Sequence, residues 1–168
     1  MGNAPRRLTR DTTRKLVLAA LFAGLGVLLS SFAIPVGGAK LFPFQHTINA
    51  VAGVLLGPWW AAGSALVTAT LRVSIGTGSL FAFPGSPFGA IAVGLAYKLL
   101  RRDEAALFEP IGTVFVGATL GAFLISPFIE EATGGLIALM VAFALSSIPG
   151  AIIGYLVLKA LRRTGHIG

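Results

Sequence analysis

Three polar side chains stand close together in a stretch of sequence that is otherwise apolar. Gln45 and Asn49 are four positions apart and His46 and Asn49 are three apart, so on a helix they share one face. In a helix surrounded by lipid, polar side chains are costly unless they face the bundle interior or a cavity. This face offers amide donors, amide acceptors and an imidazole, without a fixed negative charge. It therefore suits a small neutral heterocycle that carries a hydroxyl and a ring nitrogen, and it does not suit a cation.

The structural alternative for these three residues is hydrogen bonding between helices. The irregular sequence beside them favours ligand binding. Residues 35–44 and 76–87 are both interrupted by glycine and proline, and non-helical backbone at membrane depth is tolerated only where protein covers it or water-filled space adjoins it. Interrupted apolar segments are also the best sequence pointer to a transporter's binding site. We therefore expect these two segments to wall an outward-facing cavity.

Further candidate binding residues come from the polar and aromatic side chains of the two segments: Lys40, Phe44, Thr77, Ser79, Phe83 and Ser86. The phenylalanines near the expected mouth are either interfacial anchors or a stacking surface for a flat ring. Lys40 is expected to be solvated or to act as a gate. For Arg72 two roles are open, snorkelling to the outer interface or holding the second segment through its backbone carbonyls, and we favour the second role.

Catalytic and metal chemistry find no support in the sequence. There is no cysteine, no glycine-rich loop ending in Lys-Ser or Lys-Thr for ATP, and no His/Glu spacing typical of a metal site. We also expect no carboxylate inside the membrane, which disfavours transport driven by protons or sodium. The sequence thus predicts a solute-binding protein that is not an enzyme, has no cofactor and has no energy source of its own.

The composition places the chain in a membrane. Its 168 residues are enough for one domain, and 55% of them are hydrophobic while 11% are charged. A soluble domain carries about a quarter charged residues, so this chain lacks the polar side chains to cover a soluble fold. Disordered chains are poor in apolar residues, so disorder is excluded as well.

The basic residues lie in three clusters between apolar stretches. The clusters hold eleven of the thirteen Lys and Arg: Arg6, Arg7, Arg10, Arg14 and Lys15; Lys98, Arg101 and Arg102; and Lys159, Arg162 and Arg163. By the positive-inside rule, six helices place all three clusters in the cytoplasm together with both termini. Glu130 and Glu131 then form a solvated pair in the last outer loop. The net charge of +7 is therefore a topology signal, and nucleic acid is excluded as a partner.

The expected fold is an all-α integral membrane protein with six transmembrane helices. The last is long or tilted, and the helices that follow the two irregular segments are short, at about 14 residues or 21 Å. A basic segment (1–15) precedes one membrane domain (16–163), and a short tail (164–168) follows it. Gly57-Pro58 predicts a turn between two helices, and Ser86 with Pro87 predicts the cap and first residue of another. The expected helices are 16–34, 43–56, 58–74, 86–100, 111–129 and 135–160. The first helix is too long for a signal-peptide core.

Small residues recur four positions apart on the first helix, as Ala19 and Ala23 and as Ala20 and Gly24. This spacing lets helix backbones approach closely. It serves either packing inside the bundle or docking of another membrane subunit.

The two irregular segments and their surroundings resemble the ThiW proteins. The first similar run is Pro35-Val36-Gly37-Gly38-Ala39-Lys40, continued by Pro43-Phe44-Gln45-His46, Asn49 and Gly57-Pro58. The second is Gly76-Thr77-Gly78-Ser79, followed by Ala82-Phe83-Pro84-Gly85-Ser86 and Gly89-Ala90. These proteins are substrate-binding (S) components of energy-coupling factor (ECF) vitamin transporters, and the resemblance covers nearly the whole chain.

The resemblance implies a six-helix S component in a prokaryotic plasma membrane. It would bind a thiamine precursor, the thiazole moiety hydroxyethylthiazole, and work with a transmembrane coupling subunit and two ATPase subunits. It also implies that Ala19 and Ala23 contact the coupling subunit and that residues 35–44 gate the site. Two alternatives stay open: an S component for another thiamine precursor or related vitamin, and a membrane scaffold without a ligand.

Overall fold

The computed structural model describes residues 10–36, 39–129 and 134–165. Within them lie α1 (Arg10–Leu29), β1 (Ile34–Val36), β2 (Ala39–Leu41), α2 (Pro43–Leu56), α3 (Pro58–Ser74), α4 (Ala82–Leu100) and α6 (Gly135–Arg163), with a segmented fifth helix between α4 and α6. The mostly helical architecture with six helical segments is confirmed. Arg6, Arg7, Gly37, Gly38, Glu130, Glu131 and the end of the tail lie outside the described residues.

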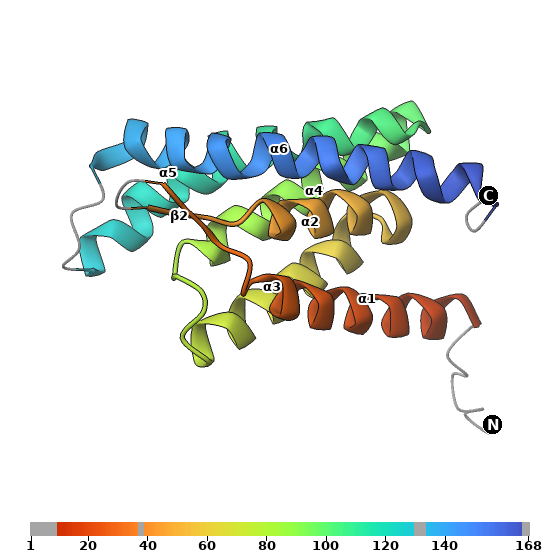
Figure 1. Ribbon diagram of the computed structural model, residues 1–168, viewed down its shortest axis with the longest axis horizontal. Coiled ribbons are helices and arrows are strands. Elements are labelled where there is room, and N and C mark those ends of the chain that lie inside the picture. Colours follow the sequence, from red (N-terminus) through yellow and green to blue (C-terminus); the bar gives the residue numbers. More distant parts are fainter. Residues whose placement is uncertain (1–9, 37–38, 130–133, 166–168) are drawn as a thin grey trace, which may run out of the picture.

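α2 is the central helix, and it is buried along most of its length. It packs against α4 and α6, while α3 packs against α4 and α1. Figure 1 shows the resulting arrangement, with α2 between α6 on one side and α1 on the other. The turn between α2 and α3 depends on Gly57, whose φ of 81° lies in the left-handed region that glycine adopts without a steric penalty. The residues at the start of α2 are therefore held in the interior of the bundle.

Four helices differ in their bounds from the sequence expectation: the first is Arg10–Leu29 instead of 16–34, the fourth begins at Ala82 instead of 86, the fifth begins at Asp103 instead of 111, and the last ends at Arg163 instead of 160. α1 ends at Leu29 because residues 34–36 leave the helix to pair with residues 39–41 in an antiparallel hairpin, which was not predicted. α4 begins at Ala82, so the predicted cap at Ser86 is wrong and Pro87 lies inside the helix. Pro84 is compatible with this earlier start, because the N–H groups of the first turn have no partner within the helix.

The fifth helix is a series of segments rather than one regular α-helix. It consists of η1 (Asp103–Phe108), η2 (Ile111–Gly117), α5 (Ala118–Leu120), η3 (Gly121–Ile125) and η4 (Ser126–Phe128), of which η2 and η3 are π-helical. Its backbone comes very close to α4: a Cβ on Gly112 would collide with the backbone of Phe88, and one on Gly117 would lie 2.7 Å from the Cα of Gly85. Single π turns are often found at functional sites.

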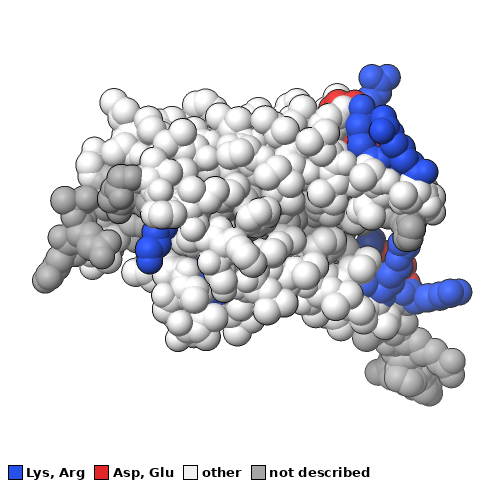
Figure 2. All heavy atoms as spheres, viewed as in Figure 1, with Lys and Arg blue, Asp and Glu red and all other residues white. Residues whose placement is uncertain are grey.

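Three helices of the described chain are long and apolar enough to cross a membrane: α1, the segmented helix Asp103–Phe128, and α6. α1 begins and α6 ends at the same end of the molecule (Figure 1). Figure 2 shows most of the visible Lys and Arg side chains gathered at that end. There Arg162 donates to both carboxylate oxygens of Asp103 at 2.8 and 2.7 Å, which joins the end of α6 to the start of the fifth helix.

Candidate functional site

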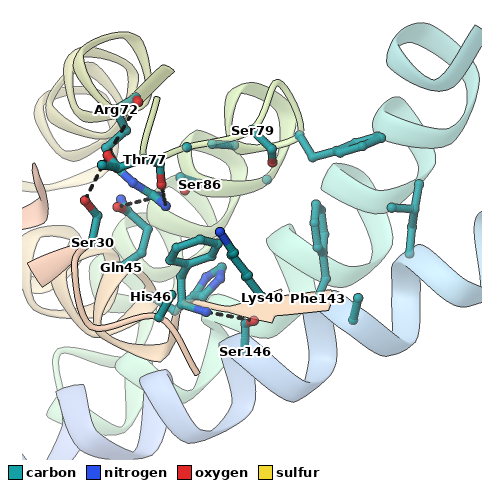
Figure 3. A pocket seen from close by; sticks show the side chains of 18 of the residues that line it. Ser30, Lys40, Gln45, His46, Arg72, Thr77, Ser79, Ser86, Phe143 and Ser146 are labelled. Atoms are coloured by element: carbon teal, nitrogen blue, oxygen red, sulfur yellow. Dashed lines mark hydrogen bonds between the residues drawn. The ribbon is translucent and has the colours of Figure 1, made fainter. Parts of the chain in front are cut away.

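A cavity of about 960 Å³ opens at the half of the molecule that is distant from this basic end. It is walled by the end of α1, the hairpin, the first turn of α2, the end of α3 with residues 76–79, the start of α4 and the first half of α6. Figure 3 shows these side chains converging from several elements. Both glycine- and proline-rich segments thus contribute to the wall.

Six of the nine candidate binding residues line this cavity: Lys40, Gln45, His46, Thr77, Ser79 and Ser86. Asn49 is one helical turn deeper, only 2% exposed, and is turned to a buried carboxylate instead. Phe44 packs edge-on against Phe32, with 6.3 Å between the ring centroids. Phe83 is half-buried and is not part of the lining. The shared helical face therefore divides into two residues at the cavity and one behind it.

Arg72 is a buried part of the cavity wall. It is 2% exposed, so the snorkelling alternative is wrong. Its Nη2 donates to the carbonyl of Thr77 at 3.2 Å, while its own carbonyl accepts from the N–H groups of Thr77 and Gly78 at 2.9 and 3.0 Å. The guanidinium also lies 4.3 Å from the ring centroid of Phe42. Arg72 therefore holds the second irregular segment, as the favoured interpretation predicts, and also contacts the first.

Arg72 reaches a third element through Gln45. Its Nη1 donates to Oε1 of Gln45 at 3.1 Å, so the end of α3 is joined to the first turn of α2 (Figure 3). The guanidinium has five N–H donors and no acceptor, so the amide oxygen of Gln45 must face it. Sequence reasoning did not predict this pairing, since the two residues are 27 positions apart.

Glu109 is the functional-site residue that sequence reasoning missed. It is fully buried and lies within the candidate membrane span Asp103–Phe128, so the expectation of no carboxylate in such a span is wrong. Its Oε1 accepts from Nδ1 of His46 at 2.8 Å, Nδ2 of Asn49 at 3.2 Å and Oγ1 of Thr113 at 2.8 Å. Its Oε2 has no partner among the described residues. The one local signal is Thr113, four positions after Glu109 and hence on the same helical face.

The packing around Glu109 leaves no room for another side chain on α4. A Cβ on Gly89 would collide with Oε1 of Glu109 and with Oγ1 of Thr113. Glycine at this position thus lets the fifth helix bring its carboxylate against α2. Because Nδ1 of His46 is taken by Glu109, Nε2 is the ring nitrogen that remains for the cavity, which His46 lines.

The charged side chains that line the cavity are basic. Lys40 and Arg72 are part of the lining, whereas no Asp or Glu of the described residues belongs to it. Glu109 lies behind His46. The rest of the wall includes Phe42 and Phe81 from the two irregular segments, and Phe143 with several small residues from α6. The contribution of α6 was not predicted, because its apolar and small residues carry no sequence signal that separates a cavity wall from ordinary packing.

The small residues of α1 fall on two different faces. Ala19 and Ala23 are 8% and 3% exposed, and their carbonyls accept from Ser64 and Thr68 of α3 at 2.8 and 3.4 Å. In this structure the pair therefore packs inside the bundle. Ala20 and Gly24 are exposed, and no atom lies within 4 Å of a Cβ placed on Gly24.

The fold is that of a known class of membrane transport protein. A solved structure described as the S-component for biotin from an ECF-type ABC transporter is similar over 95% of both chains, with a TM-score of 0.64 and 19% sequence identity. At this identity the likeness shows the fold and leaves the ligand open. A comparison with curated proteins gives no match.

The family follows from the sequence itself. Residues 16–164 match the family described as thiamine-precursor transporter protein (ThiW). This match covers the bundle except the start of α1, and it includes both irregular segments and every residue of the cavity wall. The chain therefore belongs to the ThiW family, and its fold is that of an ECF S component.

Proposed function

We propose that this chain is the substrate-specificity subunit of an ECF importer and that it captures hydroxyethylthiazole, the thiazole moiety of thiamine. The observation that carries the proposal is the cavity beside the first turn of α2, where Gln45 and His46 add an amide and an imidazole to a wall of aromatic and small apolar side chains, hydroxyl groups and two basic residues. A few placed polar groups in an apolar pocket are typical of small-molecule sites. The ring of the ligand contacts the aromatic side chains, while its nitrogen and hydroxyl meet Gln45 and His46.

The positive-inside rule orients the molecule for uptake. The basic end lies in the cytoplasm, so the cavity opens to the outside. The cavity volume of about 960 Å³ is larger than a single thiazole ring requires. The hairpin that carries Lys40 closes over the bound ligand and reduces this volume. Binding therefore begins on the outer side without an energy source within this chain.

ATP-driven release requires partner subunits. A coupling subunit in the membrane and two ATPase subunits complete the importer. On this chain the contact for the coupling subunit is the exposed face of α1, which carries Ala20 and Gly24 beside the exposed leucines Leu21, Leu25 and Leu28.

Ligand binding to the purified protein in detergent tests the proposal. Hydroxyethylthiazole should bind the wild type, and Gln45→Ala and His46→Ala should each weaken binding about tenfold or more, because each removes a hydrogen bond in a desolvated site. Thr70→Ala is the matched control, since Thr70 is an exposed residue of α3 outside the lining. A melting temperature for each variant separates loss of binding from loss of folding.

Other outcomes identify the alternatives. If mass spectrometry identifies a different small molecule that copurifies with the wild type, the ligand is another thiamine precursor or vitamin and not the thiazole. If Gln45→Ala and His46→Ala disrupt assembly with partner subunits while no ligand binds, the chain is a scaffold and the transport proposal fails.

A further inference from the structure

Two charged residues of the site each fix the orientation of a neutral polar neighbour. Arg72 can only donate hydrogen bonds, so its 3.1 Å contact holds Oε1 of Gln45 toward the guanidinium. The amide nitrogen of Gln45 then faces away from Arg72 and has no partner among the described residues. Because Gln45 lines the cavity, this NH₂ group is a hydrogen-bond donor for whatever the cavity holds.

Glu109 has the same effect on His46. Its Oε1 already accepts from the amide nitrogen of Asn49 and from the hydroxyl of Thr113. A carboxylate oxygen can only accept hydrogen bonds, so the 2.8 Å contact between Oε1 of Glu109 and Nδ1 of His46 places a proton on Nδ1. The nitrogen left for the cavity is therefore Nε2.

We propose that Arg72 and Glu109 are positioning residues that set the hydrogen-bonding polarity of the cavity, with the NH₂ of Gln45 as a fixed donor and Nε2 of His46 as the second contact. The ligand class this selects is a heterocycle with an unprotonated ring nitrogen, which accepts from Gln45. This inference rests on the proposed function, which identifies the cavity as a ligand-binding site. It adds that the ring nitrogen, rather than ring shape alone, determines selectivity.

The free-energy cost of burying the charged side chains of Arg72 and Glu109 supports a positioning role for both residues. Buried charges in a membrane protein are expensive and are found where they do specific work, and Arg72 forms no ion pair with a described acidic residue. Arg72 and Glu109 instead bind the two adjacent residues that open the cavity-facing turn of α2. If Arg72 served only to hold residues 76–79, the orientation of the Gln45 amide would not matter for binding.

The variant Gln45→Glu distinguishes whether Arg72 orients the Gln45 amide for ligand binding or only holds residues 76–79. The carboxylate has nearly the same shape and pairs with Arg72 at least as well as the amide does, so the fold should persist with an unchanged or higher melting temperature. It has no N–H for the ligand. The probes are hydroxyethylthiazole and its thiophene counterpart, in which a CH group replaces the ring nitrogen.

The wild type should bind the thiazole about tenfold or more tightly than the thiophene, as expected for one hydrogen bond in a desolvated site. In Gln45→Glu the affinity for the thiazole should fall by a similar factor and the ratio between the probes should approach one. A Gln45→Glu variant that keeps the wild-type affinity and ratio would overturn the proposal.

Nitrogen NMR of the wild type with ¹⁵N-labelled histidine gives a test without any ligand. The resonances of His46, assigned by their loss in His46→Gln, should show a protonated Nδ1. Resonances of a ring protonated only at Nε2 would overturn the proposal. If the wild type binds neither probe, the proposed thiazole ligand fails, and this NMR result alone then decides whether Glu109 positions His46.

Discussion

Nδ1 of His46 donates a hydrogen bond of 2.8 Å to Oε1 of Glu109, across 63 positions of sequence and between α2 and the fifth helix. Glu109 is fully buried, and Asn49 and Thr113 donate to the same oxygen. The contact thus joins the cavity wall to the interior of the bundle. It makes the stability of the fold and the geometry of the site depend on one carboxylate.

Removal of this carboxylate should be strongly destabilising. Glu109→Ala leaves the buried donors of His46 and Asn49 without their acceptor, although Thr113 keeps the carbonyl of Gly85. It also opens a cavity, and breaking a buried polar network of this kind costs about 3 kcal/mol or more. We expect a large drop in the melting temperature in detergent. Glu104→Ala is the control, since Glu104 is an exposed residue of η1, the segment directly before Glu109, and it should melt near the wild type. Equal melting temperatures for the two variants would show that the network around Glu109 contributes little.

The space beside the carboxylate gives a second stability test. Gly89→Ala places a methyl group against Glu109 and Thr113, and forcing atoms into a packed interior typically costs about 1–3 kcal/mol. Gly63→Ala is the matched control, because a Cβ on Gly63 in α3 meets no atom within 4 Å. Alanine is favoured over glycine in a helix by up to about 1 kcal/mol, so the control should be as stable as the wild type or more so. Thermal unfolding compares the two, and destabilisation of both alike would contradict the steric argument.

The fold and the site differ in how far the sequence predicts them. The end of α2 and the start of α3 can be predicted from local sequence, because Gly57 suits a left-handed turn and Pro58 suits the first turn of a helix. The face of Gln45 and His46 also follows from spacing along one helix. Asn49 shares that face, yet it lies one turn deeper and meets Glu109 instead of the cavity, which only the packing of another helix determines.

Glu109 shows why a charge pattern alone is insufficient. It follows the basic residues after α4, so its position in the sequence suggests the cytoplasmic surface, while the structure starts the fifth helix at Asp103 and carries Glu109 into the interior. The hairpin was missed for a related reason. Three residues per strand, as in the pairing of residues 34–36 with 39–41, are too few for a periodic pattern, and glycine-rich sequence between them equally suits an irregular loop.

The contacts of Arg72 predict that charge alone does not preserve the site. Arg72→Lys keeps a cation, but a single ammonium cannot reproduce the planar guanidinium, which donates to Gln45 and to Thr77 while it stacks on Phe42. Ligand affinity should fall about tenfold or more, measured by calorimetry with hydroxyethylthiazole. Lys98→Arg, the reverse exchange at the basic end of the molecule, serves as the control and should leave affinity unchanged. Wild-type affinity in Arg72→Lys would show that any cation suffices there.

The two faces of α1 should respond oppositely to the same enlargement. Ala23 is 3% exposed and its carbonyl accepts from Thr68, so Ala23→Leu forces α1 away from α3 and should lower the melting temperature. Gly24 has open space around it, so Gly24→Leu should fold and bind ligand as the wild type does. If the exposed face of α1 is the docking surface, Gly24→Leu should nonetheless fail to copurify with a coupling subunit, because close helix approach requires small residues. Coexpression followed by affinity purification of the coupling subunit measures this. A Gly24→Leu protein that copurifies normally would place the docking surface on another helix.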